Sequence, residues 1–227
     1  MCYLCGRRLE GDIARDHVPP KQIYAQEIRK RHDLNLFRLP VHKPCNESYQ
    51  KDEEYFVATV TPVVGDTYAG RALWNDARKK WARPEGERLG QMIINEFDRI
   101  VLPGGIASKR FDAVRVRRVI WKITRGLFFK QQKRFLPEEK PKHISVTSRL
   151  EKPDQELGYV LAYVTRTKSK GRYPGVFDYK YADIPEGEER HRWLWAMLFW
   201  DSLISLTIFH DPVCTCLECE GNSKESP

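Results

Sequence analysis

In the N-terminal part of the chain, the order of hydrophobic and polar positions predicts two short strands followed by a helix. The run Ile-Ala-Arg-Asp-His-Val at 13–18 suits a first strand, which ends at Pro19-Pro20 because proline interrupts regular pairing. The polar stretch 21–31 is expected to form a short connecting helix. Alternation over 34–41 predicts a second strand, and a helix is expected from Asn46 to about Val57.

The middle of the chain predicts helices. Apolar residues recur at helical spacing over 74–81 and 87–100, with an interruption at Pro103-Gly104-Gly105. The longest predicted helix covers 111–129 and has two distinct faces. One face is apolar: Val116, Val119, Ile120, Ile123 and Leu127. The other is basic: Arg115, Arg118, Lys122 and Arg125.

The C-terminal part predicts a sheet. Segments 159–165 and 176–181 alternate and are expected to be strands, whereas 138–153 is expected to be a loop. The aromatic run at 193–209 is broken by Asp201 and Ser202, which favours two core strands over one helix. The overall prediction is an α+β fold in three parts: 1–60, an accessory region at 61–213 that is helical and then β-rich, and a cysteine-containing tail at 214–227.

Two pairs of possible metal ligands bracket the first part of the chain. Cys2 and Cys5 are separated by two residues, and so are His42 and Cys45. Thiolate and imidazole are the donors that tetrahedral zinc prefers, and this spacing lets both donors of a pair reach one ion. We therefore expect a structural zinc site. On this spacing alone, a purely structural zinc module is an equally good interpretation.

The remaining three of the six cysteines lie near the C-terminus, so the cysteines cluster at the two ends of the chain. Such clustering argues for metal binding rather than a disulfide framework. The spacing of His210, Cys214, Cys216 and Cys219 suits either a second zinc site or free thiols in a flexible terminus, and the sequence leaves both open.

Several motifs together resemble one family. They are Cys2-x-x-Cys5, Asp16-His17-Val-Pro-Pro20-Lys21, Asn35-Leu36-x-x-Leu39-Pro40-x-His42-x-x-Cys45-Asn46 and Lys51-Asp-Glu-Glu-Tyr55. In order and spacing they are similar to the HNH endonucleases, in which a β-hairpin and a helix surround one divalent cation (the ββα-metal fold). The resemblance covers about the first quarter of the chain.

The resemblance implies a role for individual residues. His17 matches the general base, Asp16 a metal-binding carboxylate, and Asn46 the closing metal ligand. Asn35 matches an asparagine that usually braces the hairpin, and one acid of 51–54 is a candidate to assist the metal. The sequence departs from the family at His42, where zinc-containing members usually have cysteine. The implied cofactors are structural Zn²⁺ and catalytic Mg²⁺ or Mn²⁺.

The chemistry of these residue types agrees with this assignment. A neutral imidazole, with an ordinary pKa of about 6.5, accepts a proton from water near neutral pH. Carboxylate and amide oxygens suit a hard cation, which would stabilise charge on a phosphate and a departing oxygen. Because adjacent strand residues point to opposite faces, Asp16 and His17 need either a local distortion or a cation and a water on opposite sides of the strand.

Charge and composition make nucleic acid the expected partner. The 227 residues carry a formal net charge of +8, with 41% hydrophobic and 31% charged residues, as in an ordinary soluble protein. The basic face Arg115, Arg118, Lys122 and Arg125 is expected to contact the DNA backbone without sequence specificity, although a solvated helix face is the alternative. No signal peptide or membrane-spanning run is evident, so a cytoplasmic location is expected.

The sequence therefore predicts a metal-dependent HNH endonuclease that hydrolyses phosphodiester bonds, with double-stranded DNA as the expected substrate. Two alternatives remain: a zinc-stabilised nucleic-acid-binding module without catalysis, and an RNase of a toxin or defence system.

Overall fold

The computed structural model describes residues 1–32, 34–102, 106–148, 155–171, 173, 175–186 and 190–222. Its N-terminal elements are β1 (Ile13–His17), η1 (Lys21–Ile23), α1 (Gln26–His32), β2 (Arg38–His42) and α2 (Lys43–Val60). They are followed by η2 (Thr61–Val63), α3 (Tyr68–Trp81), α4 (Pro84–Asn95), β3 (Phe97–Leu102), β4 (Ile106–Lys109) and α5 (Ala113–Gln132). The last elements are β5 (Lys142–Ser148), α6 (Gln155–Thr165), β6 (Phe177–Glu186), β7 (Arg190–Phe199), β8 (Leu203–His210) and α7 (Leu217–Asn222).

The mixed α+β prediction is confirmed. Strands β1 and β2 form an antiparallel hairpin in which Asp16 is opposite Leu39 and His17 is opposite Arg38. Helix α2 begins directly after β2, and Pro44 in its first turn suits a helix start because the first backbone N–H groups have no partner within a helix. Strands β3 and β4 form a second antiparallel pair, and β5-β8-β7-β6 form a four-stranded antiparallel sheet.

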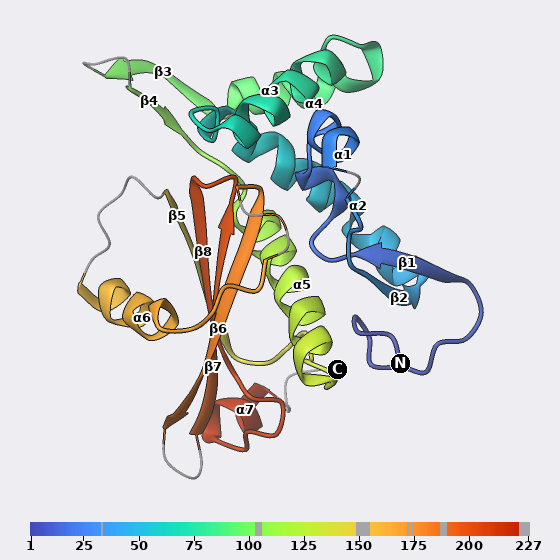
Figure 1. Cartoon of the computed structure of the whole chain (residues 1–227), viewed down its shortest axis with the longest axis vertical. Helices are drawn as coiled ribbons and strands as arrows, with labels where there is room; N and C mark the ends of the chain where they lie inside the picture. Colours follow the sequence, from blue (N-terminus) through green and yellow to red (C-terminus); the bar gives the residue numbers. More distant parts are fainter. Residues whose placement is uncertain are drawn as a thin grey trace.

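Helix α5 is the central element of the fold and runs between the four-stranded sheet and the N-terminal hairpin and helix (Figure 1). Its start is capped by the carboxylate of Asp112, which accepts hydrogen bonds from the backbone of Val114 and Arg115 at 3.1 and 3.2 Å. Towards the sheet it packs aromatic rings edge to face, including Trp121 on Phe209 with ring centroids 5.4 Å apart.

The predicted division of 193–209 into two core strands is confirmed, because β8 pairs with β7 along its whole length, from Leu203 opposite Phe199 to His210 opposite Arg192. The aromatic side chains of this segment are interior: Trp195, Phe199 and Trp200 have no exposed surface. Helix α6 covers the other face of the sheet, where Val164 packs with Leu194 and Leu206.

Three secondary-structure predictions were wrong in whole or in part. The segment 159–165 is helical, because its mostly apolar run has no clear period and tertiary packing against the sheet decides the outcome. Part of the expected loop 138–153 is strand β5, which exists through pairing with the distant β8. The helix expected over 87–100 ends at Asn95, and β3 begins at Phe97.

The predicted break at 103–105 lies outside the described residues. Among the helices that the structure describes, none has the length and apolar character needed to cross a lipid bilayer.

The close approach of α5 to the hairpin yields a stability prediction. A Cβ atom at Gly126 would lie 2.8 Å from both methyl groups of Val18 and 3.2 Å from the Tyr3 ring, so Gly126→Ala overpacks this contact. We expect a loss of about 1–3 kcal/mol in the free energy of unfolding, measured by chemical denaturation. Gly158→Ala is the matched control, because nothing lies within 4 Å of its Cβ position in α6 and alanine favours a helix by up to about 1 kcal/mol. Equal stability of the two variants would contradict the close contact.

Candidate active site

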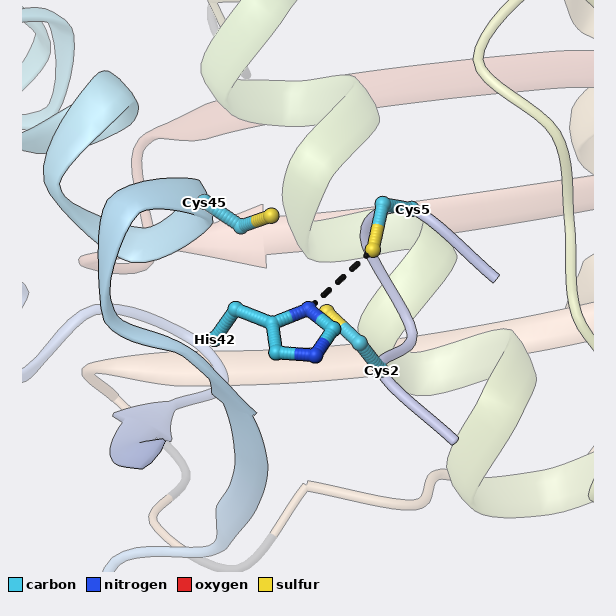
Figure 2. A group of neighbouring side chains, drawn as sticks. All are labelled: Cys2, Cys5, His42 and Cys45. Atoms are coloured by element: carbon cyan, nitrogen blue, oxygen red, sulfur yellow. Dashed lines mark hydrogen bonds between the residues drawn. The ribbon is translucent and has the colours of Figure 1, made fainter. Parts of the chain in front are cut away.

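The two N-terminal ligand pairs meet in one cluster. Cys2 and Cys5 lie in the turn before β1, His42 ends β2, and Cys45 lies in the first turn of α2 (Figure 2). One ligand atom from each of the four residues lies within 4.8 Å of the others. The group can therefore hold a structural metal ion such as zinc.

The surroundings of this cluster favour metal ligation through Nδ1 of His42. That atom lies 3.3 Å from Sγ of Cys5, while Nε2 lies 2.9 Å from the carbonyl oxygen of Arg8. An imidazole whose Nε2–H donates to a carbonyl has a lone pair left on Nδ1 for a metal. Gly6 turns the ligand loop with φ +72° and lies against the ring of Phe135, which leaves no room for a side chain. No disulfide joins any of the six cysteines, all of which the structure describes.

Asp16 points from β1 into the protein interior. It is 5% exposed, and its Oδ2 accepts a hydrogen bond from the hydroxyl of Tyr3. The same oxygen lies 2.8 Å from Nζ of Lys122 on α5. Burial and the neighbouring Asp16 raise the pKa of Tyr3 well above its ordinary value, so this phenol remains a hydrogen-bond donor. The Asp16 carboxylate thus has two fixed donors on one oxygen.

Lys122 joins Asp16 to two residues of α2. Its ammonium group forms an ion pair with Glu53 and lies 3.4 Å from Oδ1 of Asn46. The structure therefore brings Asp16 and Asn46 together, as predicted for the cation site, but around the ammonium group of a lysine. Burial raises the pKa of Glu53, and the neighbouring Lys122 opposes this effect.

His17 is positioned on the other side of the hairpin. It lines a cleft of about 460 Å³ whose wall also contains Asn35 and four cationic residues, Lys21, Arg29, Lys30 and Arg38. No acidic residue is found among the described residues that line this cleft. Burial, followed by the charges of Lys21 and Arg38, lowers the pKa of His17 below 6.5. The cleft thus combines a neutral imidazole with a positively charged wall.

The three predicted catalytic residues do not share one cavity, because Asp16 and His17 follow the alternation of a regular strand. Of the two arrangements that the sequence allowed, a local distortion is not seen. Asp16 and the ammonium group of Lys122 lie on one side of the strand, and His17 lies on the other.

The prediction of an exposed basic face on α5 needs correction. The side chains of Lys122 and Arg125 are each 1% exposed, so neither can reach a nucleic-acid backbone. Arg115 and Arg118 are partly buried and both pair with Asp52 of α2. The periodicity marked a polar face, but that face packs on α2 and the N-terminal turn instead of facing water. The guanidinium of Arg125, for example, donates hydrogen bonds to the carbonyl oxygen of Leu136, at 2.8 Å, and to that of Leu4 in the N-terminal turn.

Sequence reasoning missed the roles of Lys122 and Tyr3 at this site. Nothing local connects Lys122 to Asn46, which is 76 residues away in the chain. Glu53 had a usable signal, because it follows Asn46 by two helical turns on the same helix face. The expectation that one acid of 51–54 lies at the cation position therefore points to Glu53.

The donor chemistry of this position fits a hard divalent cation. Asp16, Glu53 and Asn46 offer two carboxylates and an amide oxygen, which are the ligand types that Mg²⁺ prefers. An ion between Asp16 and Asn46 would, however, compete with the ammonium group of Lys122, which already contacts both oxygens.

Comparison of the chain with protein-family models, with curated proteins and with solved structures gave no match. Function must therefore be argued from the site itself.

The buried ammonium group gives a prediction about stability. Lys122→Met should remove about 3–5 kcal/mol from the free energy of unfolding, since two buried carboxylates then lack their partner. Arg117→Met, an exposed change on the same helix, should alter stability by no more than about 0.5 kcal/mol. The measurement is urea denaturation of both variants. A Lys122→Met protein as stable as Arg117→Met would show that the ion pairs contribute little.

Proposed function

We propose that this chain is a metal-dependent endonuclease of the HNH type that hydrolyses phosphodiester bonds in double-stranded DNA. The observation that supports the proposal most directly is the hairpin β1–β2 followed by α2. It presents His17 in a basic cleft on one side of β1, and it brings Asp16 and Asn46 to one buried ammonium group, that of Lys122, on the other side.

In this proposal the cleft binds the phosphate. Lys21, Arg29, Lys30 and Arg38 attract the backbone and hold a phosphate near His17. A neutral His17 accepts a proton from a water molecule as that water attacks phosphorus. The lowered pKa of His17 keeps the imidazole neutral, and so able to act as base, at neutral pH.

Asp16 and Asn46 are the residues that would hold the divalent cation, with Glu53 as a third oxygen donor. When bound, such a cation supplies positive charge to the phosphate and the leaving oxygen. The zinc cluster has a structural part in this scheme. Its ligands lie on the turn before β1, at the end of β2 and in α2, so the ion would fix the hairpin against the helix.

The ammonium group of Lys122 favours a second candidate function, a zinc-stabilised nucleic-acid-binding module without catalysis. If Lys122 remains on Asp16 and Asn46, no divalent cation can bind between them. Binding by the basic cleft would then occur without cleavage.

The first test concerns His17. Purified wild type and His17→Ala are incubated with supercoiled plasmid, labelled duplex DNA, single-stranded DNA and RNA, with Mg²⁺, Mn²⁺ or a chelator. We expect cation-dependent nicking of duplex DNA by wild type and a decrease of about 10²–10⁴-fold in His17→Ala, because removal of a general base costs this much.

His32→Ala serves as the matched control, since His32 is exposed at the end of α1 and does not line the cleft. Equal cutting by wild type and His17→Ala would remove His17 from the mechanism. Binding with no cleavage under any cation would support the binding module, and cleavage confined to RNA would support the RNase.

The second test concerns the cleft wall. Lys30→Gln combined with Arg38→Gln removes two exposed cations from the lining. If each contacts one phosphate, DNA affinity should fall and the slope of log affinity against log salt should decrease by about 2. Fluorescence anisotropy of a labelled duplex over a salt series measures both quantities. Arg88→Gln, an exposed change on α4, should leave the slope as in wild type. The same slope in all three proteins would exclude the cleft as the binding surface.

A further inference from the structure

A second cluster of sulfur and nitrogen ligands lies at the opposite end of the chain from the first. His210 is the last residue of β8, and Cys214, Cys216 and Cys219 follow it in the C-terminal segment. One ligand atom from each of these residues lies within 4.8 Å of the other three. All four come from one short segment, so the grouping does not depend on how distant parts of the chain pack.

The distances within the cluster match those around a tetrahedral ion. Nδ1 of His210 lies 3.6 Å from Sγ of Cys214, 3.2 Å from Sγ of Cys216 and 3.5 Å from Sγ of Cys219. With Zn–S of about 2.3 Å and Zn–N of about 2.0–2.1 Å, the nitrogen and each sulfur of a zinc tetrahedron are about 3.5 Å apart. One ring nitrogen has either one proton or one lone pair, so it cannot hydrogen-bond three sulfurs at once. A shared ion accounts for all three distances.

The second ring nitrogen of His210 has the partner that a ligating histidine needs. Its Nε2 lies 3.1 Å from a carboxylate oxygen of Glu218. A carboxylate at this position holds the proton on Nε2 and leaves Nδ1 as the donor to the metal. In the N-terminal cluster, the carbonyl of Arg8 has the same relation to His42.

The charge of the site is also partly balanced. Three thiolates and one Zn²⁺ ion leave a net negative charge, and Nζ of Lys140 lies 3.5 Å from Sγ of Cys219 and 3.1 Å from the carbonyl oxygen of Cys214. Lys140 comes from the segment between α5 and β5, so the cluster is held from outside its own loop.

Asp211, which lies between His210 and Cys214, anchors the ligand loop to the rest of the fold by hydrogen bonds. Asp211 has no exposed surface, and its carboxylate accepts hydrogen bonds from Arg134 at 2.6 and 3.0 Å and from Trp193 at 2.8 Å. It also accepts a hydrogen bond from the backbone of Val213 at 2.9 Å, which shapes the turn towards Cys214. The loop is thereby preorganised between the end of α5 and the neighbouring strand β7.

We propose that His210, Cys214, Cys216 and Cys219 form a second structural zinc site, which fastens the C-terminal segment to the end of the sheet. Three sulfurs and one imidazole in tetrahedral arrangement select zinc among the common divalent ions, because hard cations prefer oxygen ligands. The proposal is independent of nuclease activity.

The test begins with the metal content of the full-length protein. Zinc per chain is measured by mass spectrometry of the metal after extensive buffer exchange. The double variant Cys216→Ser/Cys219→Ser should contain about one zinc fewer than wild type, whereas His143→Ala, an exposed histidine of β5, should retain the wild-type content. Unchanged zinc content in the double variant would overturn the proposal.

A second measurement needs no variant and so does not depend on how the double variant folds. Native wild type is treated with a thiol-alkylating reagent while a coloured chelator reports zinc release, and the modified peptides are identified by mass spectrometry. We expect Cys214, Cys216 and Cys219 to react only as zinc is released, at a rate slower than in the denatured protein. Rapid alkylation of these three thiols without release of zinc would overturn the proposal.

Discussion

A single buried ammonium group, that of Lys122, is the interaction on which the N-terminal half of the structure depends. It connects α5 to two elements that come much earlier in the sequence, because its partners are Asp16 on β1 and the two α2 residues Asn46 and Glu53. The Lys122 side chain is 1% exposed, and Asp16 and Glu53 are almost as deeply buried. In such surroundings, loss of the ammonium group would leave two buried carboxylates without their counter-ion. The position of α5 relative to the hairpin is therefore set by charge as well as by apolar packing.

The alternation of a β-strand separates the site into two sides. Asp16 faces Lys122 in the interior, whereas the next residue, His17, faces the basic cleft. In the proposed function, His17 and a cation held by Asp16 and Asn46 would act on the same phosphate only if that phosphate reached the edge of β1. Asn35, in the segment before β2, lines the cleft together with His17. The proposed catalysis thus depends on how far a bound strand penetrates the cleft.

Local patterns in the sequence predicted much of the N-terminal part. The hairpin, the helix after it and the four ligands Cys2, Cys5, His42 and Cys45 follow from short spacings, and the structure brings those ligands together. The role of Lys122 was beyond such reasoning, since its contact with Asn46 spans 76 residues. Periodicity shows that one face of a helix is polar, but not whether that face meets water or buried carboxylates. For this reason the sequence analysis wrongly expected Lys122 and Arg125 of α5 to be exposed to a nucleic acid.

The C-terminal part was less predictable because its elements depend on partners far along the chain. Strand β5 has a weak pattern of its own and pairs with β8. The segment 159–164 of helix α6 is apolar throughout, so its periodicity does not distinguish a helix from a strand, and packing on Leu194 and Leu206 favours the helix. The two strands β7 and β8 could be predicted from the sequence, because Asp201 and Ser202 divide the aromatic segment into two runs of strand length.

The order of ribosomal synthesis gives the contact between α5 and the N-terminal turn a further meaning. The ligands of the first cluster emerge early, yet the carbonyl of Leu4 receives its hydrogen bond from Arg125, which is 121 residues later in the chain. Phe135, which lies against Gly6, emerges later still. A nascent chain that ends before α5 would hold the Asp16 and Glu53 carboxylates without a counter-ion. The N-terminal module would then complete its interior only after the central helix has left the ribosome.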